Sequence, residues 1–401
     1  MFRINSEVAL KLVLLFTAIN SSIFIAFSPG IVGRLVIAVF MNVAGLLLFL
    51  SFNRLKNGFS EVHKYFQVVF LFLLLWSVGV FTRGMTFDSV NLISLFGHYL
   101  MGWAWLTPLA IVFGFTVSNW LLVFDFLKVL LLVSMFLSLL VFIRNDLATG
   151  MLELLVLFPV LLMTFFYQTK GTRFVAALSL IVFLVLSYFA SQRINVIFSS
   201  LFLLFLMVGY FKRKETNRVV RIVIVCSISV GVLFFFVNSD FIVASIMGHE
   251  TLSVDTRTFL FEELFSDLDS LALLIGRGAL GTYFSPYFSQ LFYSGIEGGD
   301  WMHRQVNEVG YLQMILKGGW IMLILHWIML IPASYLGMFK SNNIIGKMCG
   351  FYILSYLILW SVSYYSVFSA EYILLWMAVG TAISPVARNF TNSEVFGRKY
   401  E

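Results

Sequence analysis

The residues best suited to chemistry stand near the end of a long polar stretch, at His303, Arg304 and Glu308. An imidazole or a carboxylate can accept a proton from a hydroxyl, and a guanidinium can bind an anion through two parallel hydrogen bonds. Residues of these types can therefore transfer a proton or bind an anion. If residues 303–308 are helical, an ion pair between Arg304 and Glu308, four positions apart, explains the same spacing.

A glycine-rich turn precedes this group, since residues 276–281 read Gly-Arg-Gly-Ala-Leu-Gly. The spacing matches the dinucleotide-binding fingerprint, but no strand–helix–strand pattern surrounds it, so the Rossmann interpretation fails. A turn of this kind can present backbone N–H groups to a phosphate, which makes Gly276, Arg277 and Gly278 candidate phosphate-binding residues. A tight turn without a ligand is the alternative.

An amphipathic helix is predicted just before the turn. Its apolar stripe follows the spacing i, i+3, i+4 and i+7, at Phe261, Leu264, Phe265 and Leu268. We expect this helix to lie on the membrane surface, with Arg257 in its first turn. Asp267 and Asp269 have the spacing of a metal-binding acidic pair in sugar-nucleotide transferases, but such a pair arises easily by chance in a loop with nine acidic residues.

The overall composition identifies the elements that must position these residues. Hydrophobic residues make up 60% of the 401 residues, charged residues only 11%, and the mean hydropathy is +0.95. A water-facing globule needs more charge than this, so soluble, disordered, collagen-like and disulfide-rich folds are excluded. The two cysteines lie in apolar runs and provide neither a disulfide framework nor a metal site. The sequence predicts an all-α polytopic integral membrane protein.

Twelve stretches are apolar and long enough to span a bilayer as helices, which takes about 20 residues each. They lie near residues 8–27, 34–52, 65–82, 98–117, 121–143, 149–168, 174–190, 194–210, 220–238, 308–333, 348–365 and 367–386. The chain then divides into transmembrane helices 1–9 (1–238), one large loop (239–305), transmembrane helices 10–12 (306–386) and a tail (387–401).

Lysine and arginine in the loops predict the orientation. With the N-terminus inside, 18 of the 26 basic residues fall on the inner face, so both termini are cytoplasmic and the large loop is outside. Seven of the eight outer basic residues are Arg, the exception being Lys317. Because guanidinium binds a diphosphate bidentately, the outer arginines, including Arg193 at a tight hinge, are candidates for that contact. Snorkelling or pairing with acids is the alternative for each of them.

Four features of the chain occur together. About twelve spans accompany one late outer loop, and Arg193 follows Ala190-Ser191-Gln192 at the outer hinge. Arg257 precedes the glycine turn, and Asn307-Glu308-Val309-Gly310-Tyr311-Leu312 leads to Lys317-Gly318-Gly319 on re-entry. In these features the chain resembles the superfamily of O-antigen polymerases and O-antigen ligases, and within it the Wzy-type polymerases. The motifs cover roughly residues 180–335.

The resemblance implies a GT-C-like glycosyltransferase in the bacterial inner membrane, with its active site facing the periplasm. It implies that a glycan leaves an undecaprenyl-diphosphate-linked oligosaccharide donor and joins a hydroxyl of a second carrier-linked unit. Repetition of this step gives O-antigen or a related surface polysaccharide. The implied partners are these lipid-linked substrates, the bilayer and a chain-length regulator protein. The net charge of +6 mainly reflects the inner basic loops, so no nucleic acid is expected.

The resemblance also implies roles for the candidate residues. The leaving group is itself a diphosphate, so arginines meet the main catalytic demand and no metal or other cofactor is implied. Arg193 and Arg257 are then catalytic residues on the diphosphate, with Glu308 or His303 as base. The predicted contacts to diphosphate or glycan come from Arg277, Arg304, Gly276 and Gly278.

Two other functions remain open at this stage. An O-antigen ligase transfers the glycan to lipid A core, and such enzymes typically carry His-Asn just before the position of Leu312. Here Asn307-Glu308 occupies that place and His303 lies nine residues earlier, which favours a polymerase. A flippase or transporter for the lipid-linked oligosaccharide also fits twelve spans. The single outer loop and the lack of visible internal repetition argue against it.

Overall fold

The computed structural model describes residues 6–27, 31–85, 87–143, 152–189, 193–213, 258–286, 303–363 and 367–397. The first half of the chain forms α1 (Ser6–Phe27), α2 (Ile31–Leu55), α3 (Lys64–Thr82), α4 (Ser89–Gly97), α5 (Ser118–Ile143), α6 (Leu152–Leu155), α7 (Phe158–Met163), α8 (Lys170–Phe189) and α9 (Arg193–Arg213). The described residues of this half also form the 3-10 helices η1 (Lys56–Glu61), η2 (Trp103–Phe115) and η4 (Phe165–Tyr167).

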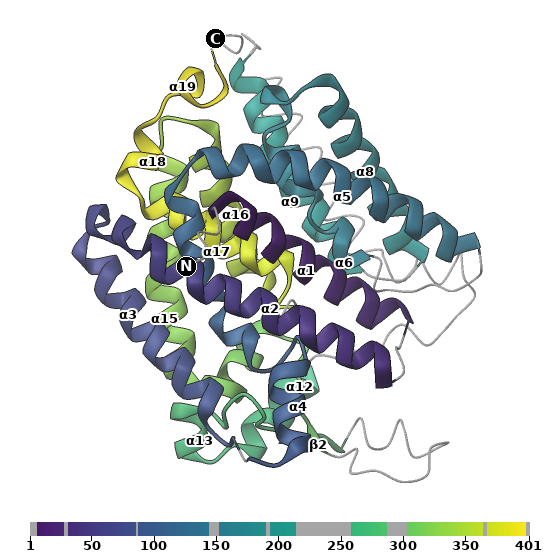
Figure 1. Cartoon of the computed structure of the whole chain (residues 1–401), viewed down its shortest axis with the longest axis vertical. Coiled ribbons are helices and arrows are strands. Elements are labelled where there is room, and N and C mark those ends of the chain that lie inside the picture. Colours follow the sequence, from purple (N-terminus) through teal and green to yellow (C-terminus); the bar gives the residue numbers. More distant parts are fainter. Residues whose placement is uncertain are drawn as a thin grey trace.

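The second half begins in the predicted outer loop with α12 (Thr258–Asp267), α13 (Ser270–Ile275), β1 (Tyr283–Phe284) and β2 (His303–Arg304). It continues as α15 (Gly310–Lys340), α16 (Ile344–Leu359), α17 (Ala370–Ile383), α18 (Pro385–Asn389) and α19 (Asn392–Phe396). Figure 1 shows α12, α13 and β2 at one end of the molecule and α18 and α19 at the other.

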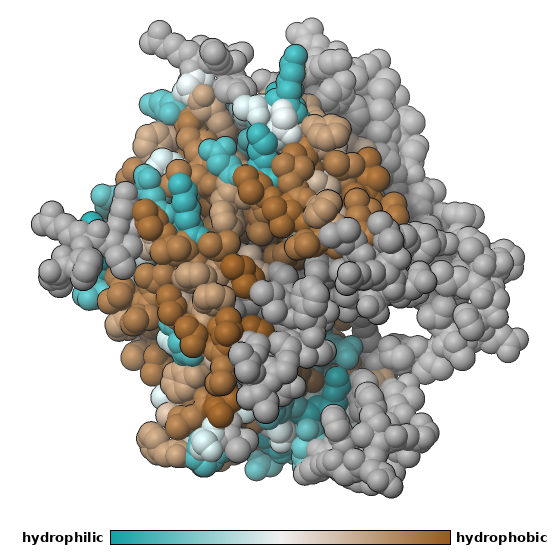
Figure 2. Space-filling view, turned by 45° about the vertical axis from the view of Figure 1, so that its right-hand side comes forward, coloured by the Kyte–Doolittle hydropathy of each residue, from teal (hydrophilic) through white to brown (hydrophobic). Residues whose placement is uncertain are grey.

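Among the described residues, five helices are long and apolar enough to cross a membrane. They cover Leu35–Glu61, Lys64–Thr82, Ser118–Leu139, Lys170–Ser187 and Gly310–Lys340. Apolar side chains also face outward, since Phe72 and Leu75 of α3 are more than half exposed. Figure 2 shows hydrophobic residues gathered over the middle of the molecule, with hydrophilic ones toward its ends. Such a surface requires lipid around it. The described residues form a helical membrane protein, and the total of twelve spans stays a prediction.

The structure differs from the predicted spans in two places. Residues 98–117 are not one α-helix, because α4 ends at Gly97 and η2 continues as a 3-10 helix that contains Pro108, which has no N–H to donate. Residues 149–168 are divided into α6, α7 and η4, with Pro159 at the start of α7. Both segments are apolar, but neither is a single uninterrupted helix. The predicted span 220–238 lies outside the described residues.

The predicted amphipathic helix is confirmed as α12, but its buried side is shifted. Leu260, Leu264 and Leu268 are buried at 0%, 0% and 5% exposure, whereas Phe261 and Phe265 stay about 40% exposed. The buried stripe therefore has the spacing i, i+4 and i+8. The leucines occupy the protein side, and Phe265 lies at its margin, where its ring stacks on Trp320 of α15 with centroids 6.3 Å apart.

α15 connects the two ends of the molecule. It packs against α3, α16 and α17, and its backbone leaves helical geometry at Gly319 (φ 69°, ψ −174°). Beyond its far end Asn343 donates to the carbonyl of Ala387 at 2.9 Å. Lys340, Lys347 and Arg388 belong to this end, so positive charge gathers there. The end with α12, α13 and β2 is accordingly the outer one under the predicted orientation.

This orientation predicts the behaviour of topology reporters. A periplasm-active reporter fused after residue 290 should be active, and fusions after residues 215 and 343 should be silent, because positive loops stay in the cytoplasm. A cytoplasm-active reporter at the same three positions is the control and should give the reverse pattern. A cytoplasmic signal at 290 would overturn the orientation and the outer placement of the candidate site.

Candidate functional site at the start of α15

A two-stranded ribbon brings the outer loop to the start of α15. β1 pairs antiparallel with β2, which places Tyr283 opposite Arg304 and Phe284 opposite His303. The rings of Phe284 and His303 lie with centroids 5.7 Å apart. The predicted group of His303, Arg304 and Glu308 is thereby joined by residues from around position 283, which are about 20 positions away in the sequence.

Arg304 and Glu308 form the ion pair that the spacing allowed. Nη2 of Arg304 lies 3.3 Å from Oε1 of Glu308, and the two side chains are 21% and 47% exposed. The assumed helix is wrong, since Arg304 belongs to β2 and α15 begins only at Gly310. A pair this exposed contributes about 0–1 kcal/mol, so it holds the Glu308 carboxylate only weakly. The carboxylate therefore remains accessible to a substrate hydroxyl.

Tyr283 is a fully buried member of the site. Its side chain is 0% exposed and lies among the charges of Arg304, Glu263 and Glu308. Burial raises the pKa of Tyr283 to about 12, an effect that Arg304 opposes and Glu263 adds to. The hydroxyl thus keeps its proton at neutral pH and can donate. Glu263 in turn accepts a hydrogen bond from Oγ of Ser285 at 2.6 Å.

Arg277 stabilises the loop through contacts of its guanidinium. Its guanidinium pairs with the carboxylate of Asp267 and donates to the carbonyls of Thr282 and Asp267, both at 2.7 Å. Asp269 instead accepts from the backbone N–H of Ala272 at 2.7 Å, at the start of α13. Asp267 and Asp269 thus have separate structural roles. Across the residues that the structure describes, no group of three or more His, Cys, Asp or Glu is placed to hold a metal ion.

The glycine-rich turn packs directly against the Lys317-Gly318-Gly319 segment of α15. Four successive N–H groups of the turn donate to carbonyls of the protein, in the pairs Gly276 to Ala272, Arg277 to Leu316, Gly278 to Lys317 and Ala279 to Val80, at 2.7 to 2.9 Å. In this conformation these N–H groups are hydrogen-bonded to carbonyls of the protein and do not point to a phosphate site. The phosphate-binding role predicted for Gly276 and Gly278 stays a prediction that would require the turn to rearrange.

Two cations hold the carbonyl side of the same turn. Nζ of Lys317, a fully buried residue, donates to the carbonyls of Ala279 and Gly281 at 2.8 and 2.7 Å. Nη1 of Arg83 donates to the carbonyls of Ile275 and Gly276. Within the described part of the chain, neither cation has a carboxylate within ion-pair distance. The guanidinium of Arg83 also lies over the ring of Trp76, 5.4 Å from its centroid. A guanidinium held by carbonyls and a ring, without a carboxylate among the described residues, makes this end of the molecule attractive to an anion.

The two arginines predicted to act on the diphosphate cannot be placed around this site. Arg257 lies outside the described residues, and Arg193 begins α9 with a side chain that is likewise outside them. Their catalytic roles stay predictions. His303 is placed, and it is an exposed residue at the edge of the ribbon.

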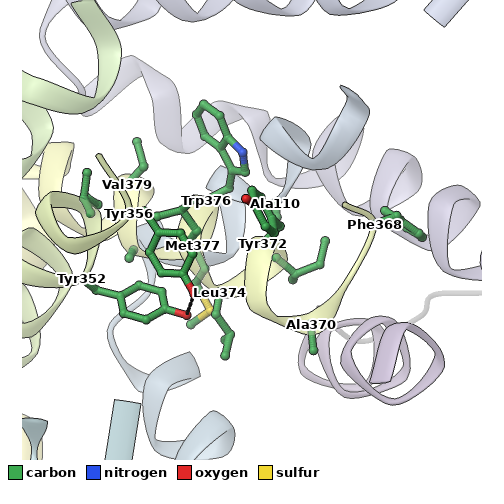
Figure 3. Packing of buried hydrophobic residues seen from close by; sticks show 14 of the residues in the cluster. Ala110, Tyr352, Tyr356, Phe368, Ala370, Tyr372, Leu374, Trp376, Met377 and Val379 are labelled. Atoms are coloured by element: carbon green, nitrogen blue, oxygen red, sulfur yellow. Dashed lines mark hydrogen bonds between the residues drawn. The ribbon is translucent and has the colours of Figure 1, made fainter. Parts of the chain in front are cut away.

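Glu371 is a buried carboxyl group of the helix bundle, and it has a hydrogen-bond partner. It is 8% exposed at the start of α17 and accepts a hydrogen bond from the hydroxyl of Tyr356. The hydroxyls of Tyr356 and Tyr352 lie 3.3 Å apart, and Figure 3 shows them facing one another within the apolar core. Nearby, Trp360 donates to Tyr372 at 2.8 Å. The carboxyl is thus held by buried aromatic side chains.

Sequence reasoning missed the buried polar members of the site. Tyr283, Asn307 and Gln313 are each 0% exposed. For Gln313 the sequence does contain a signal of a site residue, because a polar amide inside an apolar helix needs a partner. For Tyr283 the sequence contains no such signal, since only the pairing of β1 with β2 brings it to Arg304.

No family model matches the chain, and no curated protein matches it. Its function must therefore be inferred from the geometry of the site and from the membrane setting.

Proposed function

We propose that the protein polymerises polyprenyl-diphosphate-linked oligosaccharide repeat units at the outer face of the bacterial inner membrane. The observation that carries this proposal is the half-exposed carboxylate of Glu308, held by a single guanidinium at the outer end of an apolar helix bundle. A carboxylate so placed can accept the proton of an acceptor hydroxyl as the new glycosidic bond forms. The donor lipid is anchored in the bilayer beside it.

Charge at the outer end supports a diphosphate leaving group. Lys317 and Arg83 place positive charge beneath the glycine turn, and neither has a carboxylate partner in the described residues. Arg193 and Arg257 are the arginines we assign to the diphosphate itself, where bidentate contacts would stabilise the charge that develops on departure. Arg277 would act indirectly, because its guanidinium positions Asp267 and the loop.

The reaction balances without a cofactor. The anomeric C–O bond to the carrier diphosphate breaks, and a new C–O bond forms to the acceptor hydroxyl, whose proton passes to Glu308. The negative charge of the leaving diphosphate is the main demand on the site. The growing chain thus moves from its carrier onto a new carrier-linked unit, and a chain-length regulator would act as a partner protein.

The test uses purified protein in lipid bilayers and one substrate pool, polyprenyl-diphosphate repeat units. We expect a ladder of longer carrier-linked chains, formed without nucleotide sugar, without lipid A core and in the presence of a chelator. Donor and acceptor are the same class of molecule, so nothing else is required. A ligase would leave the pool unextended until lipid A core is added. A flippase would move the lipid between leaflets and form no bond, and loss of the ladder in chelator would show a need for a metal ion.

A further inference from the structure

Two side-chain amides are completely buried at the start of α15. Asn307 and Gln313 are both 0% exposed. The backbone N–H of Asn307 donates to Oε1 of Gln313 at 2.8 Å, and the N–H of Val309 donates to Oδ1 of Asn307 at 3.0 Å. Because both amide oxygens accept from N–H donors, the orientation of each amide is determined, and its NH₂ group points away from that donor.

Neither NH₂ group has a hydrogen-bond partner in the part of the chain that the structure describes. Nδ2 of Asn307 and Nε2 of Gln313 are buried polar atoms without an acceptor among the described residues. An unsatisfied buried donor costs about 1–3 kcal/mol, so two of them side by side are not expected in a finished core. Asn343, equally buried, shows the normal case, since its Nδ2 donates to the carbonyls of Ala387 and Phe390 at 2.9 and 3.0 Å.

The surroundings of these amides determine which ligand fits. Asn307 directly precedes Glu308, and Gln313 is hydrogen-bonded to Asn307. The charged groups of this site gather around Tyr283, which lies close to the guanidinium of Arg304 and to the carboxylates of Glu263 and Glu308. Because two carboxylates outnumber one guanidinium around Tyr283, an oxyanion bound beside its hydroxyl would meet net repulsion. A neutral ligand with many hydroxyl groups can satisfy both the donors and the carboxylates.

We propose that the buried amides of Asn307 and Gln313 bind the acceptor sugar as a neutral polyhydroxylated ring, with Tyr283 as a third donor. This assignment rests on the proposed glycosyl transfer and separates the site into two parts. The sugar of the incoming unit lies against the amides, which brings one of its hydroxyls to Glu308. The diphosphate of the donor lies apart from it, where cations are not balanced by carboxylates.

The test measures sugar binding without requiring catalysis. Wild-type protein in nanodiscs is mixed with methyl glycosides of neutral hexoses and N-acetylhexosamines, and binding is followed by saturation-transfer NMR. Asn307→Asp and Gln313→Glu keep the size of each side chain and its accepting oxygen but replace the unsatisfied NH₂ with an acceptor. Tyr283→Phe removes only the hydroxyl. Each substitution should weaken binding about three- to tenfold, the value of one hydrogen bond.

The matched control is Gln67→Glu. Gln67 is partly buried, and its NH₂ already donates to the carbonyls of Phe59 and Val62, both at 2.7 Å. This variant should bind the glycosides as the wild type does, even though it loses two hydrogen bonds. Circular dichroism and size-exclusion chromatography confirm folding of all four variants. Unchanged glycoside binding in Asn307→Asp, Gln313→Glu and Tyr283→Phe would overturn the proposal.

Three further outcomes decide between the ligand classes and between the two proposals. Failure of every methyl glycoside to bind the wild type would reject a sugar site here. Binding of inorganic diphosphate that is lost in Asn307→Asp and Gln313→Glu would assign the amides to an anion instead. If glycosides bind through the amides but no polymer ladder forms from lipid-linked units, the sugar site stands and the polymerase function fails.

Discussion

Glu308→Gln should reduce the rate of polymerisation by about 10²–10⁴-fold, the usual contribution of a general base. The amide keeps the shape of the side chain and can still accept a hydrogen bond from Arg304, but it cannot take the proton of the acceptor hydroxyl. Glu308→Asp should retain more activity than Glu308→Gln because it keeps the carboxylate at a shorter reach. The measurement is the initial rate of ladder formation from polyprenyl-diphosphate repeat units at equal protein levels.

Two variants separate catalysis from ion pairing. If Glu308 serves only to pair with Arg304, then Arg304→Gln should be at least as damaging as Glu308→Gln, because it removes the guanidinium of the 3.3 Å contact, whereas Glu308→Gln keeps a neutral hydrogen bond there. Under the proposed mechanism Arg304→Gln is the milder change. Glu262→Gln, on an exposed residue of α12, is the control and should have wild-type activity. Full activity in Glu308→Gln would leave Glu308 with a structural role and make His303 the next candidate base.

The sequence predicted those parts of the fold that depend on local hydrophobicity. Long apolar runs gave α1, α2, α3, α5, α8, α9, α15, α16 and α17, within a few residues at most ends. It failed where apolar runs contain local breaks, because a hydropathy window does not register how Pro108 or Pro159 changes the backbone. For α12 the helix was right, and the choice of buried side depended on contacts that only the tertiary structure supplies.

The candidate site could be predicted only where its members are close in the sequence. Arg304 and Glu308 are four positions apart, and their pairing is confirmed. Tyr283 reaches them through the β1–β2 pairing, which two-residue strands do not reveal in sequence. The unsatisfied amides of Asn307 and Gln313 are a property of packing, since the residue types alone do not show which atoms lack partners.

The glycine motifs have a structural explanation that their sequence pattern did not give. Gly276 (φ 75°, ψ 175°) and Gly319 (φ 69°, ψ −174°) both adopt backbone conformations that are essentially restricted to glycine. A Cβ on Gly276 would lie 2.3 Å from the carbonyl carbon of Lys317, and a Cβ on Gly319 would lie 2.1 Å from the carbonyl oxygen of Leu274. The two motifs thus pack against each other where the outer loop meets α15. At this contact the backbone of each segment leaves no room for a Cβ on the glycine of the other segment.

Gly319→Ala and Gly276→Ala should therefore each destabilise the protein by about 3–5 kcal/mol, at the upper end of single substitutions. The clash is with backbone atoms, which cannot move aside as a side-chain tip can, and the backbone conformation, which only glycine adopts readily, adds strain of about 1–3 kcal/mol. The loss should appear as a lower melting temperature in detergent and a smaller yield of folded protein. The α13–α15 contact positions the loop that carries Tyr283, so polymerisation should fall as well.

Two other glycines separate the contribution of backbone strain to this loss of stability from the contribution of the clash. Gly397 (φ 81°, ψ 163°) has the same backbone conformation, but a Cβ there meets no heavy atom within 4 Å, so Gly397→Ala measures the conformational strain alone. Gly79 lies inside α3 with equally open space, and Gly79→Ala should be neutral or slightly stabilising because alanine favours a helix. If Gly319→Ala and Gly276→Ala cost no more than Gly397→Ala, the close contact between the turn and the Gly319 kink is not what holds the outer loop on α15. In that case the loop must be held mainly by Lys317 and Arg83, whose hydrogen bonds to its carbonyls would be the next to remove.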